Sequence, residues 1–150
     1  MQIPATQINA SGSNAMEVAY TQFTSAVNIT ANSEATADTI VTATAFSANG
    51  TSAYLIEFFA ERWSSNQVNG RLLIYLYDGG SSIGLGFDGI IPTVGAQTGG
   101  VYVAVRIVPS AGTKTYSWRG SCSLGTTTVN AGAGGNAATF PGFIRISKVT

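Results

Sequence analysis

Seven carboxylates are the only conventional acid–base side chains in this sequence, because it contains no histidine. Histidine is the commonest general base and the commonest transition-metal ligand. A glycosidase needs two carboxylates that face each other across a cleft. Glu57 lies in an apolar run and Asp78 opens a turn, so an ion pair and a turn acceptor are the alternative interpretations. The carboxylates are Glu17, Glu34, Asp38, Glu57, Glu61, Asp78 and Asp88.

The cysteine and aspartate residues give little support for nucleophilic catalysis or metal binding. The single cysteine, Cys122, excludes an intrachain disulfide and a cysteine-rich zinc site. It alternates with Trp118 on the predicted core side of a strand, which favours an inert buried thiol. Asp78 and Asp88 lack the oxygen-rich spacing of calcium-binding loops. We predict no catalytic residue, no cofactor and no metal site.

The glycines from Gly84 to Gly89 match the dinucleotide-binding pattern G-x-G-x-x-G in the order GLGFDG. That site needs a helix whose N-terminus meets the pyrophosphate. The residues that follow are Ile90, Ile91 and Pro92, which do not begin a long helix. The motif therefore favours glycines that bend or bulge a sheet.

An aromatic side chain in a polar segment is the best candidate for ligand contact. Trp63 lies between Arg62 and Asn66 in the sequence ERWSSNQ. An indole ring flanked by a cation and amides is suited to stacking on a sugar ring. Arg62, Trp63 and Asn66 are accordingly the candidate glycan contacts. The alternative is that Trp63 covers the end of the domain or contacts a neighbouring subunit.

Composition excludes some partners. Charged residues make up 9% of the chain, against about 25% in an ordinary globular protein. Seven basic and seven acidic side chains cancel, so the basic field that nucleic-acid binding requires is missing. No basic leader and no apolar run of about 20 residues occurs, so neither a secretory signal nor membrane insertion is expected. A chain this poor in charge is better suited to an assembly than to life as a lone monomer.

Short runs rich in Val, Ile, Thr, Tyr and Phe, separated by Gly, Asn, Ser and Pro, are typical of strands and turns. The spacing predicts an all-β fold, an antiparallel β-sandwich of jelly-roll type with about eight to ten strands. Residues 1–16 are polar and lack periodicity, which predicts an N-terminal attachment arm before a sandwich domain at 17–150. The predicted strands are Glu17–Phe23, Ala26–Thr30, Asp38–Phe46, Tyr54–Glu61, Arg71–Tyr77, Ile83–Phe87, Val101–Val108, Thr115–Cys122, Thr126–Asn130 and Phe143–Val149.

Two predicted strands are apolar on both faces, around residues 54–59 and 72–77. Such strands need cover on two sides, and the sequence offers no helix to supply it. The simplest cover is another copy of the same chain. We therefore predict a homo-oligomer, a trimer, with an interface built from Leu55, Phe59, Leu73, Tyr75 and Tyr77.

An ordered set of sequence blocks resembles a domain common in structural proteins of tailed bacteriophages. The blocks are VAYTQFTSAVNITANSEATADTIVTA, YLIEFFAER, LLIYLYDGGSSIG, RIVPSAGTKTYSWR, AGAGG and FPGFIRISKV. The similarity covers residues 17–150 and is to minor tail, fibre or head-surface components. It implies a β-sandwich, often trimeric, that is displayed on the virion and carries no enzymatic activity.

A short arm ahead of a compact domain fits a capsid decoration protein or a small tail component better than a long fibre. In that hypothesis the arm at 1–16 docks onto the major capsid or tail protein by strand addition. The loops at 61–69, 89–100 and 130–140 then stabilise the shell or touch the host surface. The alternative function is a carbohydrate-binding receptor-recognition module, or a glycan depolymerase that uses Glu57 and Asp78.

Overall fold

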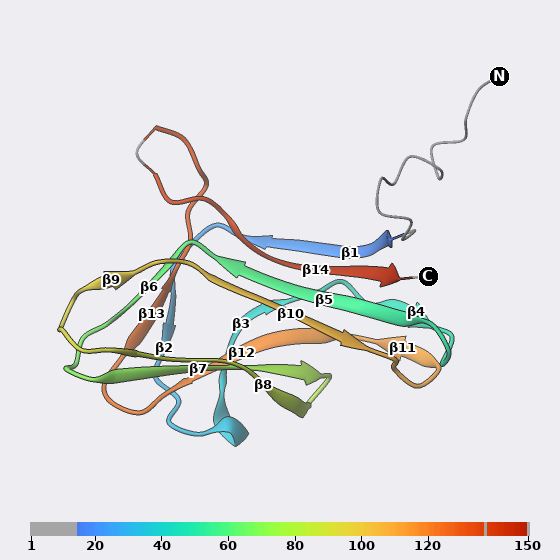
Figure 1. Ribbon diagram of the computed structural model, residues 1–150, viewed down its shortest axis with the longest axis horizontal. Coiled ribbons are helices and arrows are strands. Elements are labelled where there is room, and N and C mark those ends of the chain that lie inside the picture. The colour runs from blue at the N-terminus through green and yellow to red at the C-terminus, as the bar shows by residue number, and fades with distance from the viewer. Residues whose placement is uncertain (1–14, 137, 150) are drawn as a thin grey trace.

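Eight long strands form two sheets that pack face to face in the computed structural model, which describes residues 15–136 and 138–149 (Figure 1). Sheet 1 has the order β1-β14-β5-β10 and sheet 2 has the order β3-β12-β7-β8. The strands of sheet 1 are β1 (Ala15–Phe23), β14 (Gly142–Val149), β5 (Ala53–Ala60) and β10 (Val101–Ile107). The strands of sheet 2 are β3 (Asp38–Thr42), β12 (Tyr116–Cys122), β7 (Gly70–Asp78) and β8 (Ser81–Ile91).

The pairing of these eight strands is nested. β1 pairs with β14, β3 with β12, β5 with β10 and β7 with β8, all antiparallel. The outermost strands in the sequence pair with each other and the innermost form a hairpin, which is the winding of a jelly roll. The predicted antiparallel β-sandwich of jelly-roll type is confirmed.

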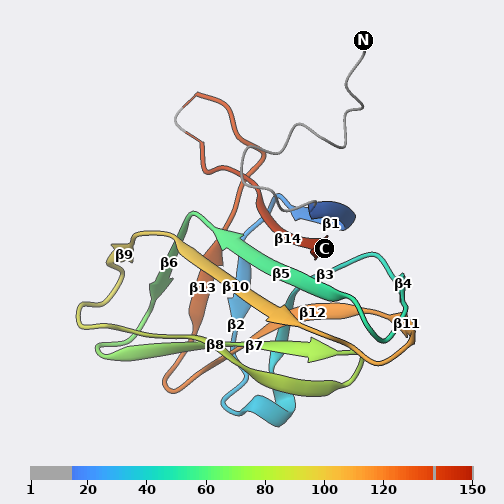
Figure 2. The ribbon, with the colours of Figure 1, turned by 45° about the vertical axis from the view of Figure 1, so that its right-hand side comes forward.

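Smaller elements extend the two sheets at their ends. A third four-stranded sheet has the order β2-β13-β6-β9, and β4 pairs with β11. Figure 2 shows these strands at the two ends of the sandwich. The small elements are β2 (Val27–Ile29), β4 (Phe46–Ala48), β6 (Arg62–Ser65), β9 (Gln97–Thr98), β11 (Gly112–Lys114), β13 (Thr127–Asn130) and the 3-10 turn η2 (Glu34–Thr36).

The core lies between sheet 1 and sheet 2, where the inward side chains of both meet. Trp118 of β12 is fully buried and packs on Phe58 of β5, with ring centroids 5.9 Å apart. Ile56, Ile74 and Ile144 are also 0% exposed. Burying each such aliphatic side chain contributes about 1.5–3 kcal/mol to folding.

Most predicted strands are present, but several elements differ, among them β8, which continues to Ile91 and so enters the predicted loop at 89–100. Asp38–Phe46 is not one strand, because β3 ends at Thr42 and β4 begins at Phe46. The predicted polar loop at 61–69 contains β6, whose residues pair with β13. The predicted arm is too long by two residues, because β1 begins at Ala15. The rest of the arm lies outside the described residues.

Several turns between strands contain a residue with a positive backbone φ angle. Gly79 has a φ of 59° in the hairpin between β7 and β8, Gly50 has a φ of 80°, and Asn69 has a φ of 58°. Only glycine and, less readily, asparagine adopt this conformation at low cost. The described part of the small-residue tract after Asn130 forms an irregular loop, as the sequence predicts.

Candidate functional site

The outer side of sheet 1 groups aromatic and charged side chains. Side chains alternate between the two sides of a strand, and Ile56, Phe58 and Ile144 point inward with 0% exposure. The positions between them therefore point away from sheet 2. The strand register groups these outward residues in three rows: Gln22, Phe143, Phe59 and Tyr102; Tyr20, Arg145, Glu57 and Ala104; Glu17, Ser147, Leu55 and Arg106. We call this surface the aromatic face.

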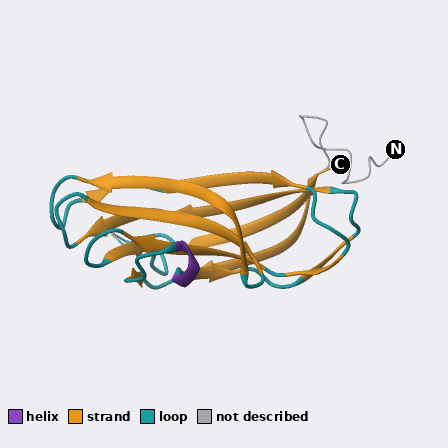
Figure 3. Cartoon of the chain, turned by 90° about the horizontal axis from the view of Figure 1, so that it is seen from below, coloured by secondary structure: helices purple, strands orange, loops and turns teal. Residues whose placement is uncertain are grey.

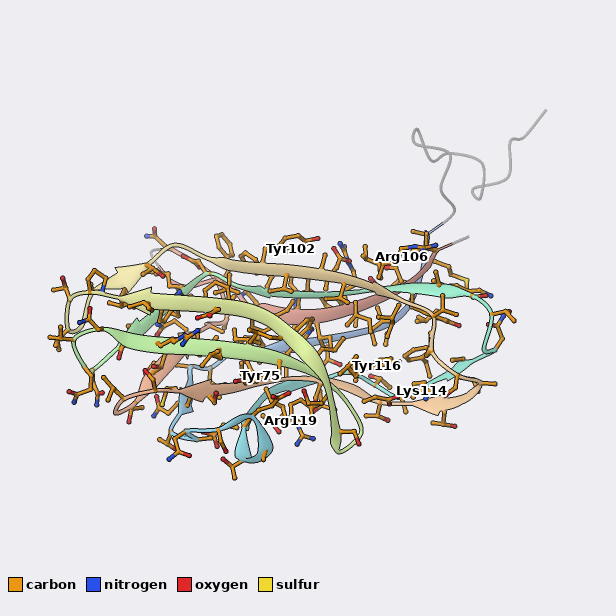
Figure 4. All side chains as sticks on the ribbon, turned by 60° about the horizontal axis from the view of Figure 1, so that its bottom comes forward. Tyr75, Tyr102, Arg106, Lys114, Tyr116 and Arg119 are labelled. Carbon is orange, nitrogen blue, oxygen red and sulfur yellow. The ribbon has the colours of Figure 1, made fainter. Side chains whose placement is uncertain are left out.

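Four aromatic rings dominate the aromatic face. Phe143 is at its centre, with its ring centroid 5.6 Å from that of Phe59 and 5.5 Å from that of Tyr20. Tyr102 on β10 continues the row beside Phe59. Tyr20 is 41% exposed and Tyr102 is 59% exposed, and Figure 4 shows Tyr102 and Arg106 on the outer side of this layer. The exposed aromatic side chains make this surface a candidate for binding.

An ion pair between a buried carboxylate, Glu57, and a partly exposed guanidinium, Arg145, lies among these rings. Arg145 donates through Nε to Glu57 Oε2 at 2.6 Å and through Nη2 to Oε1 at 2.7 Å. The Tyr102 hydroxyl donates to the same Oε1 at 2.6 Å. Glu57 is 3% exposed, so its charge is neutralised by a bidentate partner instead of water. The interpretation of Glu57 as one half of an ion pair is confirmed.

The contacts of Glu57 fix its protonation state. Hydrogen bonds from Arg145 hold the pKa of Glu57 below its ordinary value of 4.5, while burial acts in the opposite direction and the Tyr102 hydroxyl adds to the lowering. The pKa of Tyr102 is raised, first because its hydroxyl donates to Glu57. An ionised carboxylate with both oxygens already hydrogen-bonded is unsuited to act as a general acid.

The two carboxylates of the depolymerase alternative do not form a pair. Glu57 points outward from β5 in sheet 1, whereas Asp78 ends β7 in sheet 2 and binds Lys114, with Oδ2 to Nζ at 3.0 Å. Two facing carboxylates are the minimum for glycoside hydrolysis. The proposal that these residues act together in catalysis is therefore wrong, because the fold places them on different sheets.

The predicted oligomer residues divide between the two sheets. Leu55 and Phe59 lie on the aromatic face and are half-buried. Leu73, Tyr75 and Tyr77 lie on the outer side of sheet 2, where Tyr75 is 8% exposed and Tyr77 is 4% exposed. The argument that these tyrosines need another copy for cover is wrong, because the chain covers them itself. An interface through Leu55 and Phe59 stays a prediction.

The cover on sheet 2 is the segment around η2, which lies outside the lower layer in Figure 1 and is the purple turn in Figure 3. Ala37 packs with Tyr75 and Tyr77. The Tyr77 hydroxyl donates to the main-chain oxygen of Glu34, and the Tyr75 hydroxyl lies 3.2 Å from Ser121 Oγ. Burial, followed by the nearby Glu34 carboxylate, raises the pKa of Tyr77.

Arg119 completes this cover from the other side. Its guanidinium lies 4.3 Å from the centre of the Tyr77 ring, and its Nη2 donates to the Gly79 oxygen at 2.9 Å. A cation over a tyrosine ring is favourable. Beside this contact is a shallow hollow of about 560 Å³. Its lining residues are Ser33, Glu34, Ala35, Tyr77, Gly80 and Ser82.

The candidate glycan contacts near Trp63 do not form a binding surface. Trp63 is 3% exposed and meets Phe87 edge to face, with ring centroids 5.9 Å apart. Arg62 donates to Gln97 Oε1 at 2.8 Å, and Asn66 Oδ1 accepts from the Thr126 amide at 2.8 Å. The assignment of Trp63 as a ligand contact is wrong, because β6 turns its indole into the core. Its interpretation as a packing residue is confirmed.

The glycine motif lies wholly within β8. A side chain at Gly86 would come within 2.7 Å of Trp118, and one at Gly89 within 2.8 Å of Trp63. The register of β7 and β8 shifts twice along the hairpin, which is the effect of β-bulges. The interpretation as glycines that bend or bulge a sheet is confirmed.

Cys122 is buried at 2% exposure, and its thiol lies 3.3 Å from the Ile29 oxygen. Burial is the first cause that raises the pKa of this thiol. A buried, protonated thiol is a poor nucleophile.

Among the described residues no group of three or more His, Cys, Asp or Glu side chains gathers to hold a metal ion. Within the same residues, no helix has the length and apolar character to cross a membrane.

Sequence reasoning misses Tyr20, Tyr102, Phe143 and Arg145 as members of one surface. Each lies in a predicted strand, and the alternation in FIRIS and VYVAVR already indicates that these side chains share a strand side. Their grouping depends on which strands are neighbours. Nested pairing of β1 with β14 joins residues more than 120 positions apart, and no local pattern encodes that.

Comparisons with known proteins find similar solved structures but no matching family model or curated protein. Among solved structures, the C-terminal CBM6 of LamC, a marine laminarinase from Zobellia galactanivorans, shares 20% identity over 82% of this chain and 99% of that chain, with a TM-score of 0.30. The carbohydrate-binding module CBM6cm-2 from Cellvibrio mixtus lichenase 5A, in complex with cellotriose, shares 20% identity over 89% of each chain, with a TM-score of 0.31. We transfer no residue role from either protein, because these TM-scores are too low.

Proposed function

We propose that this chain is a non-enzymatic structural module of a tailed-phage virion, and that copies of it join as a homotrimer through the aromatic face. The sequence blocks that resemble phage structural proteins support the setting. The aromatic face supports the mechanism, because no other described part of the chain covers its two exposed rings, Tyr20 and Tyr102. Its work is mechanical: the copies hold each other in place on the particle.

The aromatic face suits permanent burial better than chemistry. Arg145 and Glu57 are already paired within one copy, so burying these two side chains beside a second copy leaves neither charge alone, and the other charged residues of the face, Glu17 and Arg106, lie in the row at its end. Tyr20 and Tyr102 supply large contact areas with few rotatable bonds. Zero formal net charge also means that copies do not repel each other at long range.

The test is the mass of the purified chain in solution. Sedimentation equilibrium should give about three times 15.4 kDa for the natural sequence. Tyr102→Lys should weaken self-association at least tenfold, because it removes the most exposed ring of the face, while its ammonium can still donate to Glu57. Leu124→Lys is the matched control, since Leu124 is 51% exposed in the turn between β12 and β13. A natural chain that stays monomeric at micromolar concentration contradicts the proposal.

The setting has a separate test. Antibodies raised against the chain should label intact phage particles in electron micrographs, at a site that repeats with the symmetry of the head or tail. Particles that carry no label after mild permeabilisation would contradict a place in the virion, whatever the oligomeric state of the purified chain.

Glycan binding by the same surface is the second candidate. The observation that favours it is the grouping of two exposed tyrosines, Tyr20 and Tyr102, with the Gln22 amide, which donates to the Tyr20 hydroxyl at 2.8 Å. Rings beside amide groups stack on sugars and hydrogen-bond to hydroxyls. Binding on a glycan array that disappears in Tyr102→Ala would favour this function. An array without signal, together with a trimeric mass, would favour assembly.

A further inference from the structure

The hollow beside η2 is formed by two segments that are far apart in the sequence. Its volume of about 560 Å³ lies within the range of about 300–1,000 Å³ that is typical of small-molecule sites. It opens on the outer side of sheet 2, and Figure 4 shows Arg119 of this side and Tyr102 of the aromatic face on opposite sides of the sandwich. Its lining residues come from the η2 segment and from the hairpin of β7 and β8, and they are Ser33, Glu34, Ala35, Tyr77, Gly80 and Ser82.

Glu34 brings a carboxylate to the hollow. Its Oε1 accepts a hydrogen bond from the Ser82 hydroxyl. Within residues 15–136 and 138–149, no side chain donates to Oε2 and no cation forms an ion pair with Glu34. Ser33 adds a hydroxyl to the lining, and its Oγ lies 2.8 Å from Thr36 Oγ1. The hollow therefore offers a charged acceptor and hydroxyl groups to a ligand.

Arg119 supplies the opposite charge beside the same hollow. Its guanidinium lies 4.3 Å from the centre of the Tyr77 ring, and its Nη2 donates to the Gly79 oxygen at 2.9 Å. Its Nε donates to Ser117 Oγ at 3.2 Å. In the described part of the chain no carboxylate forms an ion pair with Arg119. A guanidinium and the carboxylate of Glu34 thus lie on either side of Tyr77 without pairing with each other.

We propose that the hollow binds a neutral sugar, as the terminal unit of a glycan. An anion would be repelled by Glu34 and a cation by Arg119. An apolar ligand would remove water from both charges and replace it with no hydrogen bond. The neighbouring hydroxyls of a sugar donate and accept, so one ring can bind the carboxylate and the guanidinium together. Ala35 offers apolar contact to the C–H groups of the ring.

This sugar site is separate from the proposed function and from glycan binding by the aromatic face. Tyr20 and Tyr102 belong to sheet 1, whereas the hollow lies on the outer side of sheet 2. Copies that join through the aromatic face leave the hollow open to solvent. A copy held in a particle can therefore still bind a sugar.

Saturation-transfer NMR on the natural chain tests the site with four probes, the methyl glycosides of glucose, galactose, mannose and N-acetylglucosamine. At least one should bind with a Kd of about 1–10 mM, the range expected for a shallow site with few hydrogen bonds. The affinity should change by less than about twofold between low and high salt, because a neutral ligand is not screened. Four glycosides without signal would overturn the proposal. Displacement of the bound glycoside by inorganic phosphate or by free lysine would overturn the choice of a neutral ligand.

A filled hollow locates the bound glycoside. Gly80 lines the hollow, and a Cβ at this position would meet no heavy atom within 4 Å. Gly80→Leu should therefore occupy the hollow without displacing a neighbour and weaken binding by about tenfold or more. Gly99→Leu, between β9 and β10, is the matched control, since a Cβ there also meets no heavy atom within 4 Å. Binding that survives in folded Gly80→Leu would overturn the proposal.

Removal of one charge gives a second, milder test. Glu34→Gln keeps the shape of the side chain and should weaken binding by about fivefold, because it replaces a charged acceptor with a neutral one. Glu17→Gln removes an exposed carboxylate from sheet 1 and should leave binding unchanged. If Tyr102→Ala abolishes binding instead, the sugar lies on the aromatic face and the proposal is overturned. The mass of the chain in solution, which tests self-association, should be the same in Gly80→Leu as in the natural chain, so the two proposals can fail separately.

Discussion

The outer sides of the two sheets both carry large apolar side chains, but the chain covers only one of them. On sheet 2, Tyr75 and Tyr77 lie under the segment around η2 and are nearly buried. On sheet 1, Tyr20 and Tyr102 remain exposed beside the ion pair of Arg145 and Glu57. The difference shows that an apolar strand face is not by itself an interface. What distinguishes the two is whether a distant segment of the same chain folds back over the face.

The largest expected effect comes from removing a covered ring. Tyr77→Ala should lower the free energy of unfolding by about 3–4 kcal/mol, since it leaves a cavity under η2. Phe59→Ala on the aromatic face should cost about 1 kcal/mol at protein concentrations where the chain is monomeric, because Phe59 is only half-buried.

Urea denaturation at several protein concentrations measures both changes. The loss of unfolding free energy in Phe59→Ala should grow with protein concentration, as more of the chain assembles. The loss in monomeric Tyr77→Ala is determined by contacts within its own chain. Equal costs for the two variants in dilute solution would contradict the difference between the two faces.

A second expected effect concerns acid, and it tests the ion pair at the centre of the aromatic face. The pKa of Glu57 is lowered in the folded chain by Arg145, so the ionised form favours folding above the ordinary value of 4.5. That contribution is lost as the pH falls through the lower folded pKa. The melting temperature should therefore decrease between about pH 5 and pH 3.

Arg145→Gln should remove part of this dependence. Without the guanidinium, burial disfavours the charged carboxylate of Glu57, so the variant is less stable than the natural chain at pH 7 and the gap narrows on acidification. Arg71→Gln is the control, because it breaks the exposed pair with Asp88 and should have little effect at any pH. If the difference in stability between Arg145→Gln and the natural chain is the same at pH 7 and at pH 3, then Arg145 does not lower the pKa of Glu57.

The smallest expected effect is the loss of one hydroxyl under the cover. Tyr75→Phe removes the contact with Ser121 Oγ and should cost about 0.5–1 kcal/mol. Tyr20→Phe, which removes an exposed hydroxyl from the aromatic face, should leave the urea midpoint unchanged. If Tyr20→Phe loses more unfolding free energy than Tyr75→Phe, the claim that sheet 2 is covered and the aromatic face is exposed is contradicted.

Local patterns predicted the strands, and they could not predict what covers them. In β12 the sequence places Tyr116, Trp118 and Cys122 on the core side, and all three are buried. It places Ser117 and Ser121 toward solvent, yet they are 2% and 1% exposed. They are buried because β12 is central in sheet 2 and the η2 segment lies over its outer side, contacts that come from residues some 80 positions away.

The candidate site shows the same limit. Residue types alone point to Trp63, because it is a tryptophan among polar residues, but β6 carries its ring inward. The exposed rings come instead from Tyr20 and Tyr102, which look like ordinary strand residues. Exposure depends on the register of β1, β14, β5 and β10, and register is a property of the whole fold.

The nested strand order has a consequence for how the chain acquires its shape. β1 is the first strand described and its hydrogen-bonded neighbour, β14, is the last. During synthesis β1 must wait until nearly all later residues have left the ribosome, and contacts this distant in sequence slow folding. Truncation before Gly142 would remove β14 and separate β1 from β5, so even a late premature stop should yield an aggregation-prone product instead of a smaller working domain.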